Sequence, residues 1–123
     1  MRRFAFSNRL RLTSREDFDR VFKKCSTRSS DALFTVLART SEHNHPRLGL
    51  VVSRKAAGNA VRRHRLKRQV RERFRLDQHE LPGADIVVIA RHGIKQSNRI
   101  EISRSLAAHW ERIREKCGHS LSS

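Results

Sequence analysis

A strongly basic stretch between two strand-like runs is the feature that most constrains this chain. It covers residues 54–75, and ten of these 22 residues are Lys or Arg, opposed by Glu72 alone. Helical periodicity after the break at Gly58 predicts a helix over about residues 60–76, with Asn59 as its N-cap. Exposed helices usually mix both signs of charge, because like charges four residues apart are destabilising. The stretch therefore indicates a helix that lies between two strands and faces a polyanion.

The predicted helix divides into an apolar stripe, an open basic face and a margin between them. The stripe consists of Leu66, Val70 and Phe74, which would pack on a sheet. Arg63 and Lys67 lie one turn apart beside this stripe, so we expect them where the helix meets the sheet. The open face is expected to carry His64, Arg65, Arg68, Arg71 and Arg75.

The pattern on either side of the basic helix predicts two further helices. The first is expected to begin after a capping box that starts at Thr13 and to end near Lys24. The last is expected to begin at a cap formed by Asn98 and to end at Gly118. Its apolar stripe comprises Ile102, Leu106, Trp110, Ile113 and Cys117.

Strands complete the predicted fold, and they cover residues 32–39, 47–53 and 85–90. Residues 25–30 are either a weak edge strand or a loop. Alternation in the first strand puts Phe34, Val36 and Ala38 on the face better suited to a core. Residues 85–90 are apolar on both faces, which is typical of a central strand.

The size and charge of the chain point to one domain that binds nucleic acid. At 123 residues the chain has room for a single core, so we interpret residues 1–123 as one domain. Lys and Arg number 28 against 12 Asp and Glu, for a net charge of +16, and nucleic acid is the commonest partner of such a protein. We expect an irregular basic arm over residues 1–12 and a frayed tail over residues 119–123.

The expected location is the cytoplasm. No apolar run approaches the roughly 20 residues that a membrane span needs, and the N-terminus lacks the apolar core of a signal peptide. Cys25 and Cys117 are far apart in the chain and fit two reduced thiols. We therefore expect no membrane partner.

Neither a catalytic residue nor a metal site is predicted. His43 and His45 lie beside Pro46 in an evident loop, without Cys or carboxylate companions at ligand spacing. The acidic residues are spread over the first and last helices and the loops, with no paired carboxylates beside the basic stretch. The pattern favours a protein that binds and positions its partner.

Phe18 and Phe22 lie with Val21 on one face of the first predicted helix and have two interpretations. They are either core residues of an amphipathic helix or a stacking platform for unpaired bases, where a ring contributes about 1–3 kcal/mol per base. Both interpretations hold if each ring keeps one face on the core and one edge in a groove. The pattern alone does not separate them.

Residues 47–68 resemble the signature of the bacterial ribonuclease P protein family, in which a strand, a lysine, a glycine, an Ala-Val pair and an arginine-rich helix follow one another. The likeness extends to residues 8–10, 17–22 and 85–91, and so to nearly the whole chain. It implies an α+β fold, an α/β sandwich with about four strands in a mixed sheet and three helices. It also implies a left-handed βαβ crossover between parallel strands, an exception to the usual handedness.

The resemblance also implies a function as the protein subunit of ribonuclease P. This subunit would bind ribonuclease P RNA and the single-stranded 5′ leader of precursor tRNA, and assist endonucleolytic removal of the leader with Mg²⁺ held mainly by the RNA. The residues implied to bind the RNA subunit are Lys55, Asn59, Arg62, Arg63, His64, Arg65, Lys67 and Arg68. Those implied to bind the leader are Phe18, Phe22, Thr35 and Leu37.

The chain departs from the family's pattern at two of these positions. His64 stands where the family usually has Asn, and Leu37 where many members have an aromatic ring, which predicts weaker stacking there. Two alternatives are a ribosomal or other structural RNA-binding protein without a role in cleavage, and an autonomous metal-dependent nuclease. DNA is disfavoured as a partner because DNA-reading helices usually follow a tight turn, whereas this one follows a strand.

Overall fold

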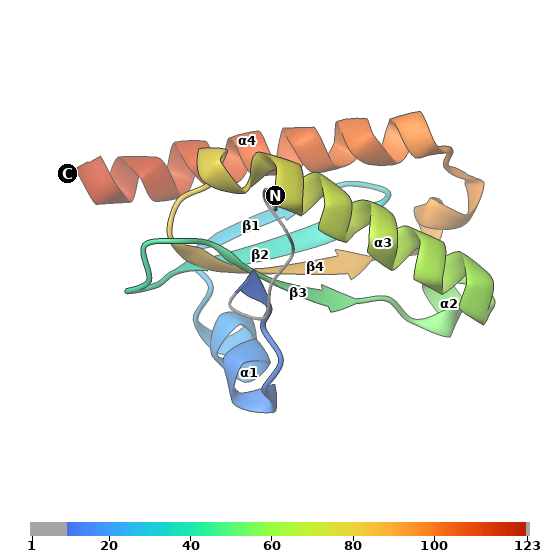
Figure 1. Cartoon of the computed structure of the whole chain (residues 1–123), viewed down its shortest axis with the longest axis horizontal. Helices are drawn as coiled ribbons and strands as arrows, with labels where there is room; N and C mark the ends of the chain where they lie inside the picture. Colours follow the sequence, from blue (N-terminus) through green and yellow to red (C-terminus); the bar gives the residue numbers. More distant parts are fainter. Residues whose placement is uncertain (1–9, 123) are drawn as a thin grey trace, which may run out of the picture.

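The computed structural model of the chain describes residues 10–122, and side chains are described as far as residue 116. A four-stranded sheet forms the middle layer, with α3 and α4 on one face and α1 against the other (Figure 1). In chain order the elements are α1 (Arg15–Lys24), β1 (Thr27–Ser30), β2 (Phe34–Thr40), β3 (Arg47–Val51), α2 (Arg54–Ala57), α3 (Ala60–Asp77), η2 (Gln78–Glu80), β4 (Ala84–Ala90), η3 (His92–Gln96) and α4 (Arg99–Ser122).

The sheet is mixed and has the strand order β1-β2-β4-β3. Strand β2 runs antiparallel to β1 and β4, whereas β3 runs parallel to β4. In Figure 1 both parallel strands point to the right, β4 lies above β3, and α3 lies above both strands, on the viewer's side of β2. This arrangement makes the β3–α3–β4 crossover left-handed, as the resemblance implied, and confirms the expected fold class.

The main core fills the space between the sheet and the layer of α3 and α4. Helix α3 buries Leu66, Val70 and Phe74, which confirms the predicted stripe. The rings of Phe74 and Trp110 meet edge to face with centroids 6.1 Å apart, a favourable geometry for aromatic pairs. Helix α4 contributes Ile102, Leu106, Trp110 and Ile113.

A smaller core lies on the opposite face of the sheet, beneath α1. It joins Val21 of α1 and Leu12 to Leu37 and Val87 of the two central strands. Both faces of β2 are therefore buried, although its alternation predicted one face better suited to a core. Since α1 is short, it covers only part of this second face.

The ends of two helices differ from the prediction. The N-cap of α1 is Ser14, not Thr13, because the Ser14 hydroxyl accepts a hydrogen bond from the Asp17 amide at 3.1 Å. Helix α4 continues past Gly118 to Ser122, since glycine inside a helix lowers its stability without obliging it to stop. The cap of α4 at Asn98 is confirmed by its bond with the Glu101 amide at 2.8 Å.

A fourth α-helix, the short α2, was missed because four residues are too few to show helical periodicity. The Ser53 hydroxyl caps it by accepting a hydrogen bond from the Ala56 amide at 3.1 Å. Gly58 then adopts φ +94°, a left-handed conformation that ends α2 before Asn59 opens α3. None of the described helices is long and apolar enough to cross a membrane.

The segment that enters α1 is tied to the sheet and does not form an irregular arm over its whole expected length. Leu10 and Leu12 are buried, one in each core. Arg11 bridges Leu48 in a parallel sense, and the Leu12 amide donates to the Leu48 carbonyl at 2.9 Å. This short segment therefore borders the outer edge of β3, while the rest of the expected arm, residues 1–9, lies outside the described residues.

A buried polar network fastens α4 to the β1–β2 hairpin. The His109 ring is fully buried, with Nδ1 2.7 Å from the Ser29 hydroxyl and Nε2 3.1 Å from an Asp31 carboxylate oxygen. Arg112 and Ser105 donate to Ser29 and Asp31 at 2.7 and 2.6 Å. A serine, a histidine and an aspartate meet here, as they do in some catalytic sites. Because Ser29 is itself buried, we interpret this group as structural.

This network should make the stability of the protein fall in mild acid. Burial lowers the pKa of His109 below its ordinary value near 6.5, outweighing Asp31, which raises it, while Arg112 also lowers it. The unfolded chain therefore binds an additional proton as the pH drops below about 6.5, and the free energy of unfolding should decline from pH 7 to pH 5. Urea denaturation at several pH values should show this decline, and His109→Gln should flatten it. Parallel pH profiles for the two proteins would contradict the assignment.

Candidate nucleic-acid interface

Helix α3 begins with a cap that also fixes one of the predicted site residues. The Asn59 side-chain oxygen accepts a hydrogen bond from the Arg62 amide at 3.0 Å. This bond engages the amide oxygen in holding the helix, so that Asn59 acts on the interface by setting where α3 starts. From this cap the helix runs for 18 residues along the sheet.

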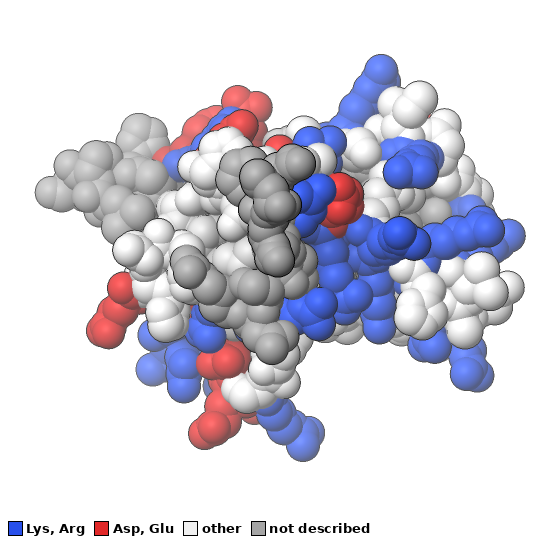
Figure 2. Space-filling view, viewed as in Figure 1, with Lys and Arg blue, Asp and Glu red and all other residues white. Residues whose placement is uncertain are grey.

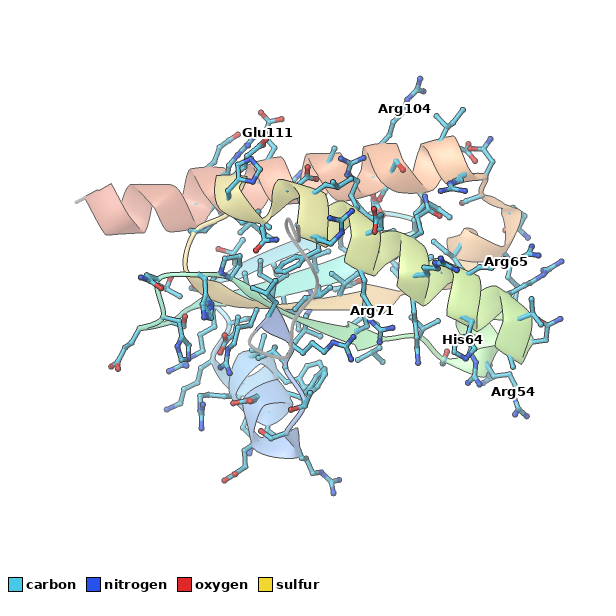
Figure 3. All side chains as sticks on the ribbon, in the orientation of Figure 1. Arg54, His64, Arg65, Arg71, Arg104 and Glu111 are labelled. Atoms are coloured by element: carbon cyan, nitrogen blue, oxygen red, sulfur yellow. The ribbon has the colours of Figure 1, made fainter. Side chains whose placement is uncertain are left out.

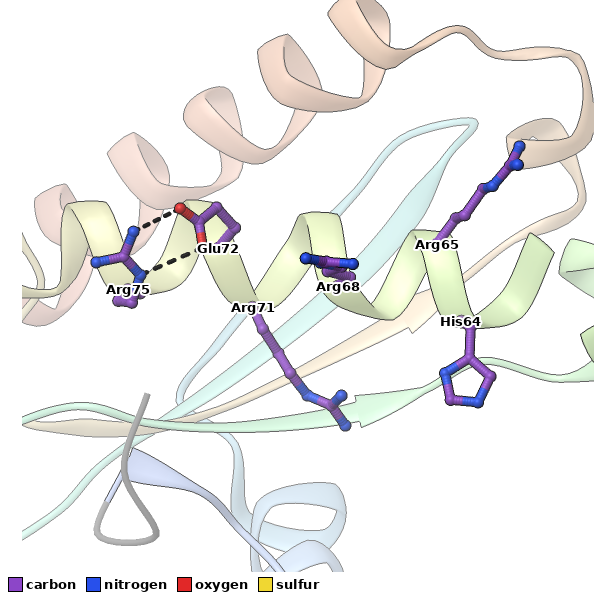
Figure 4. A pocket seen from close by; sticks show the side chains of 6 residues that line it. All are labelled: His64, Arg65, Arg68, Arg71, Glu72 and Arg75. Carbon is purple, nitrogen blue, oxygen red and sulfur yellow. Dashed lines mark hydrogen bonds and ion pairs between the residues drawn. The ribbon is translucent and has the colours of Figure 1, made fainter. Parts of the chain in front are cut away.

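The outer face of α3 is a basic groove, lined by His64, Arg65, Arg68, Arg71, Glu72 and Arg75. Five of these residues are the open face predicted from helical periodicity. Figure 2 shows the Lys and Arg atoms gathered over α3 and the strip beside it, with few acidic atoms among them. In Figure 4, Arg65 points toward η3 and α4, whereas His64 and Arg71 point toward β3. The groove therefore presents cations to both sides of the helix.

The two halves of α3 differ in the number of described ion pairs. In the second half, Arg75 donates through Nε and Nη2 to Glu72, and Arg73 donates to Asp77 at 3.0 Å. The hydrogen bond to Glu72 raises the pKa of Arg75 and lowers that of Glu72. In the first half, the structure describes no ion pair for Arg62, Arg63, Arg65, Lys67 or Arg68. The charge available to a polyanion is therefore concentrated in the first half of the helix.

The residues expected to bind the RNA subunit lie on α2, at the cap of α3 and along the first half of α3. Lys55 is exposed on α2, directly before the cap. Arg63 and Lys67 are half-buried, Lys67 lines a hollow with Leu48 and Leu50 of β3, and the remainder of the set is exposed. The sequence did not indicate Lys95 of η3, which shares a hollow with Arg62 and Arg65. Lys95 belongs to a loop-like segment with no periodicity to single it out.

The residues expected to bind the leader come together on the opposite face of the sheet. The rings of Phe18 and Phe22 stack at 30° with centroids 6.4 Å apart, and Phe22 is 44% exposed. Phe18 packs on Gly49, where an added Cβ would lie 2.7 Å from the ring. Phe18 therefore combines a core contact with partial exposure, while Phe22 offers an open ring.

The two predicted leader residues of β2 lie deeper than the aromatic rings. Leu37 is only 4% exposed beneath α1, and the Thr35 hydroxyl lies 2.8 Å from that of Ser30. The half-buried neighbours on this face are Val51 and Ile89, which pair across the sheet in register with Thr35. Strand alternation would have placed both on this face, although it could not show that α1 leaves them partly uncovered.

An arginine fork holds α1 in place over the sheet. Arg47 of β3 donates through Nε and Nη2 to the two carboxylate oxygens of Asp85, both at 2.9 Å. A third contact, 3.7 Å from Nη1 to Asp17, joins this fork to α1. The bond to Asp85 raises the pKa of Arg47, so the guanidinium stays charged. The fork thereby fixes the position of Phe18, which follows Asp17 on α1.

The carboxylates near α3 do not offer a ligand set for a metal ion. Glu72 and Asp77 are engaged by Arg75 and Arg73. In the part of the chain that the structure describes, no three His, Cys, Asp or Glu residues gather as metal ligands would. The basic groove is therefore suited to bind anions and not cations.

Comparison with known proteins decides the family. The family model described as Ribonuclease P matches residues 6–114 of the chain. The chain belongs to the ribonuclease P protein family. It is thus the protein component of a ribonucleoprotein endoribonuclease that takes part in tRNA processing, and ribonuclease P RNA is its partner.

The relatives cover nearly the full length of the chain. The ribonuclease P protein component of Idiomarina loihiensis is 39% identical over 113 residues, 92% of this chain and 90% of that protein. That of Methylococcus capsulatus is 44% identical over 119 residues, 97% and 92% of the two chains. These matches confirm the resemblance carried by residues 47–68 and give no support to a ribosomal protein.

Solved structures of the family share the fold. The RNase P protein of Staphylococcus aureus superimposes with a TM-score of 0.77 at 36% identity, covering 85% of this chain and 94% of that one. The RNase P protein from Thermotoga maritima gives 0.76 at 38% identity, covering 84% and 96%. The four-stranded mixed sheet and its helices are therefore the fold of this family.

Proposed function

We propose that the protein binds ribonuclease P RNA through the first half of α3 and the 5′ leader of precursor tRNA through the face that carries α1. The observation behind the proposal is that two surfaces of different chemistry lie on opposite faces of one sheet. Cations without described carboxylate partners lie along the first half of α3, whereas aromatic and aliphatic side chains line the other surface. The edge of β3 separates them.

The first surface has the chemistry of phosphate binding. Arg62, Arg65 and Arg68 project guanidinium groups that match phosphate oxygens in a bidentate manner. Each phosphate neutralised releases counterions, so affinity for the RNA subunit should fall steeply as salt rises. His64 adds an exposed imidazole, which can donate or accept a hydrogen bond at the point where the family usually has an amide.

The second surface has the chemistry of binding to a single strand. Phe22 presents an open ring, and Val51 and Ile89 extend the apolar surface beside Phe18. Such a surface stacks bases with little regard to their identity, which suits leaders of many sequences. The absence of an aromatic ring at Leu37 leaves the stacking to the α1 rings.

We assign the catalytic Mg²⁺ ions to the RNA subunit. The residues beside the basic groove do not fit a metal ion, because Glu72 is already bound by Arg75 and the other lining side chains are basic. The contribution of the protein is then to hold the two RNAs together and to neutralise phosphates. For the same reason we expect no cleavage by the protein alone with added Mg²⁺.

Reconstitution tests this function. With a bacterial ribonuclease P RNA, the protein should restore cleavage of precursor tRNA at Mg²⁺ concentrations too low for the RNA alone. Failure to restore cleavage across a titration of salt and Mg²⁺ would contradict the proposal. Sequencing of RNA that copurifies with the protein is a second test, since a ribosomal RNA partner would support the alternative.

Arg63→Ala should weaken holoenzyme assembly more than Arg75→Ala. Arg63 is half-buried with no described ion pair, whereas Arg75 is already neutralised by Glu72. We expect a loss of roughly tenfold or more for Arg63, as for a charge-assisted hydrogen bond, and a clearly smaller loss for Arg75. Binding to the RNA subunit at matched salt measures both. Equal losses would contradict the ranking.

Phe22→Ala should weaken binding of precursor tRNA by the holoenzyme while leaving binding of mature tRNA unchanged. Loss of one stacked base corresponds to roughly 5- to 150-fold in affinity. Because Phe22 is 44% exposed, the free energy of unfolding should change little. Ile100→Ala, on α4 and 63% exposed, is the matched control. A similar loss for both tRNAs would argue against a leader contact.

A further inference from the structure

A separate cluster of positive charge lies at the outer edge of β3, between α1 and α3. Arg11, Lys67 and Arg71 line a hollow there, and Leu48, Leu50 and the Phe18 ring form its apolar walls. Arg71 belongs to the predicted open basic face, but neither Arg11 nor Arg71 was among the residues that the resemblance implies for the RNA subunit or the leader. The hollow adjoins the leader surface through Phe18 and the basic groove through Arg71.

The three cations are brought together by two separate parts of the chain. Arg11 is positioned by its bridge to Leu48 and by the adjacent bond between the Leu12 amide and the Leu48 carbonyl. Lys67 and Arg71 lie one turn apart on α3. Figure 4 shows the Arg71 side chain directed from α3 across β3, away from Arg65. Backbone contacts with β3 therefore position Arg11, and the helical repeat of α3 positions Lys67 and Arg71.

The positive charges of Arg11 and Arg71 repel each other, which favours binding of an anion beside them. Burial, followed by the positive charge of Arg11, lowers the pKa of Arg71. Within the described residues, neither Lys67 nor Arg71 forms an ion pair. The nearest carboxylate on α3, that of Glu72, is bound to Arg75 on the other side of the groove (Figure 4). The apolar walls strengthen the attraction for an anion, since charges interact more strongly where water is excluded.

We propose that Arg11, Lys67 and Arg71 form a binding site for one backbone phosphodiester of RNA, at the junction of the leader surface and the RNA-subunit surface. The two guanidinium groups offer paired donors for phosphate oxygens, and Lys67 adds a point charge. The inference rests on the proposed function, because it requires RNA on both sides of the β3 edge. Bound there, a strand is held in a fixed register between the two surfaces.

Neutral linkages test the site. Methylphosphonate would replace single phosphodiesters, first in the leader of precursor tRNA and then in the RNA subunit, and affinity would be measured with wild-type protein and with Arg71→Gln. We expect Arg71→Gln to lose about tenfold or more in affinity. The slope of log affinity against log salt should fall by somewhat less than one, since one fewer phosphate is neutralised. At one linkage, methylphosphonate should lower the affinity of the wild-type protein by the same factor. The same replacement should not lower the affinity of Arg71→Gln any further. Whether that linkage lies in the leader or in the RNA subunit identifies the source of the phosphate.

Arg104→Gln is the matched control, because it removes the same charge from an exposed position on α4 that points away from the sheet (Figure 3). Arg71→Lys keeps the charge without the fork and should retain part of the affinity. Equal losses of affinity for Arg71→Gln and Arg104→Gln would overturn the site. So would the absence, in both RNAs, of any linkage at which the effect of methylphosphonate disappears in Arg71→Gln. Failure of the proposed function is distinct, since it would be seen with wild-type protein as a lack of restored cleavage. Thermal denaturation should show both Gln variants folded, because Arg71→Gln relieves repulsion from Arg11.

Discussion

Asp85→Ala should lower the free energy of unfolding by about 3–5 kcal/mol, as expected when one partner of a buried ion pair is removed. The Asp85 side chain is 2% exposed and receives both bonds of the Arg47 fork. Without it, Arg47 retains only Asp17, 3.7 Å away, while its own side chain remains mostly buried. Urea denaturation followed by circular dichroism measures the loss.

Two further variants distinguish the buried charge from a general effect of the substitution. Asp17→Ala should lose much less, because Asp17 is more exposed than Asp85 and makes the longer contact. The double variant Arg47→Met with Asp85→Leu should recover most of the stability, since apolar replacements remove the unpaired charge. A loss for Asp85→Ala no larger than that for Asp17→Ala would show that the fork does not act as a buried pair.

The same fork connects stability to leader binding. Arg47 joins β3 to α1 through Asp17, and the next residue of α1 is Phe18. Loosening this contact should move the Phe18 ring relative to Gly49 and weaken the apolar surface beside Phe22. In conditions where Asp85→Ala remains folded, we therefore expect weaker binding of precursor tRNA and unchanged binding of the RNA subunit.

Local patterns were enough to predict the elements that carry the RNA-subunit surface. Helix α3 shows its cap at Asn59, its stripe from Leu66 to Phe74 and its basic face directly in the order of residues. Strand β4 is apolar on both faces because it is central in the sheet and covered on both sides. In each case the interactions that decide the structure lie within one element, so periodicity reveals them.

Several of the features that were missed depend on contacts between distant parts of the chain. Ser29 and His109 are 80 residues apart, and no spacing indicates that α4 will lie over β1. Arg47 and Asp85 meet only because β3 and β4 pair in parallel. Leu37 is buried because α1 crosses that part of the sheet, which alternation within β2 cannot show.

Pairing within α3 was also hidden from the sequence and changes how its charge should be counted. Residues 54–75 contain ten Lys and Arg residues, eight of them on α3, and within this stretch only Glu72 opposes them. Within α3, Glu72 binds Arg75 and Asp77 binds Arg73; outside it, Glu80 of η2 binds Arg114 of α4 at 2.9 Å. The position of a cation along α3, and not only the total charge, should therefore determine its contribution to RNA binding.

The triple variant Arg62→Gln, Arg65→Gln and Arg68→Gln should lower affinity for ribonuclease P RNA by roughly a thousandfold or more. Each substitution removes a guanidinium without a described carboxylate partner, and a charge-assisted hydrogen bond contributes about 1.5–3 kcal/mol. The slope of log affinity against log salt should fall by roughly two to three, since three fewer phosphates are neutralised. Titration of labelled RNA at several salt concentrations measures both quantities.

A second triple variant with the same net charge isolates the effect of position. Arg73→Gln, Arg75→Gln and Arg114→Gln remove three guanidinium groups that are already bound to carboxylates. If RNA binding depends on the position of each cation along α3, this control should keep most of its affinity and nearly all of its salt dependence. If net charge alone attracts the RNA, the two triple variants should lose affinity equally, because both lower the formal charge by three. Equal losses would therefore reject the first half of α3 as the RNA-subunit surface, even though the family assignment would stand.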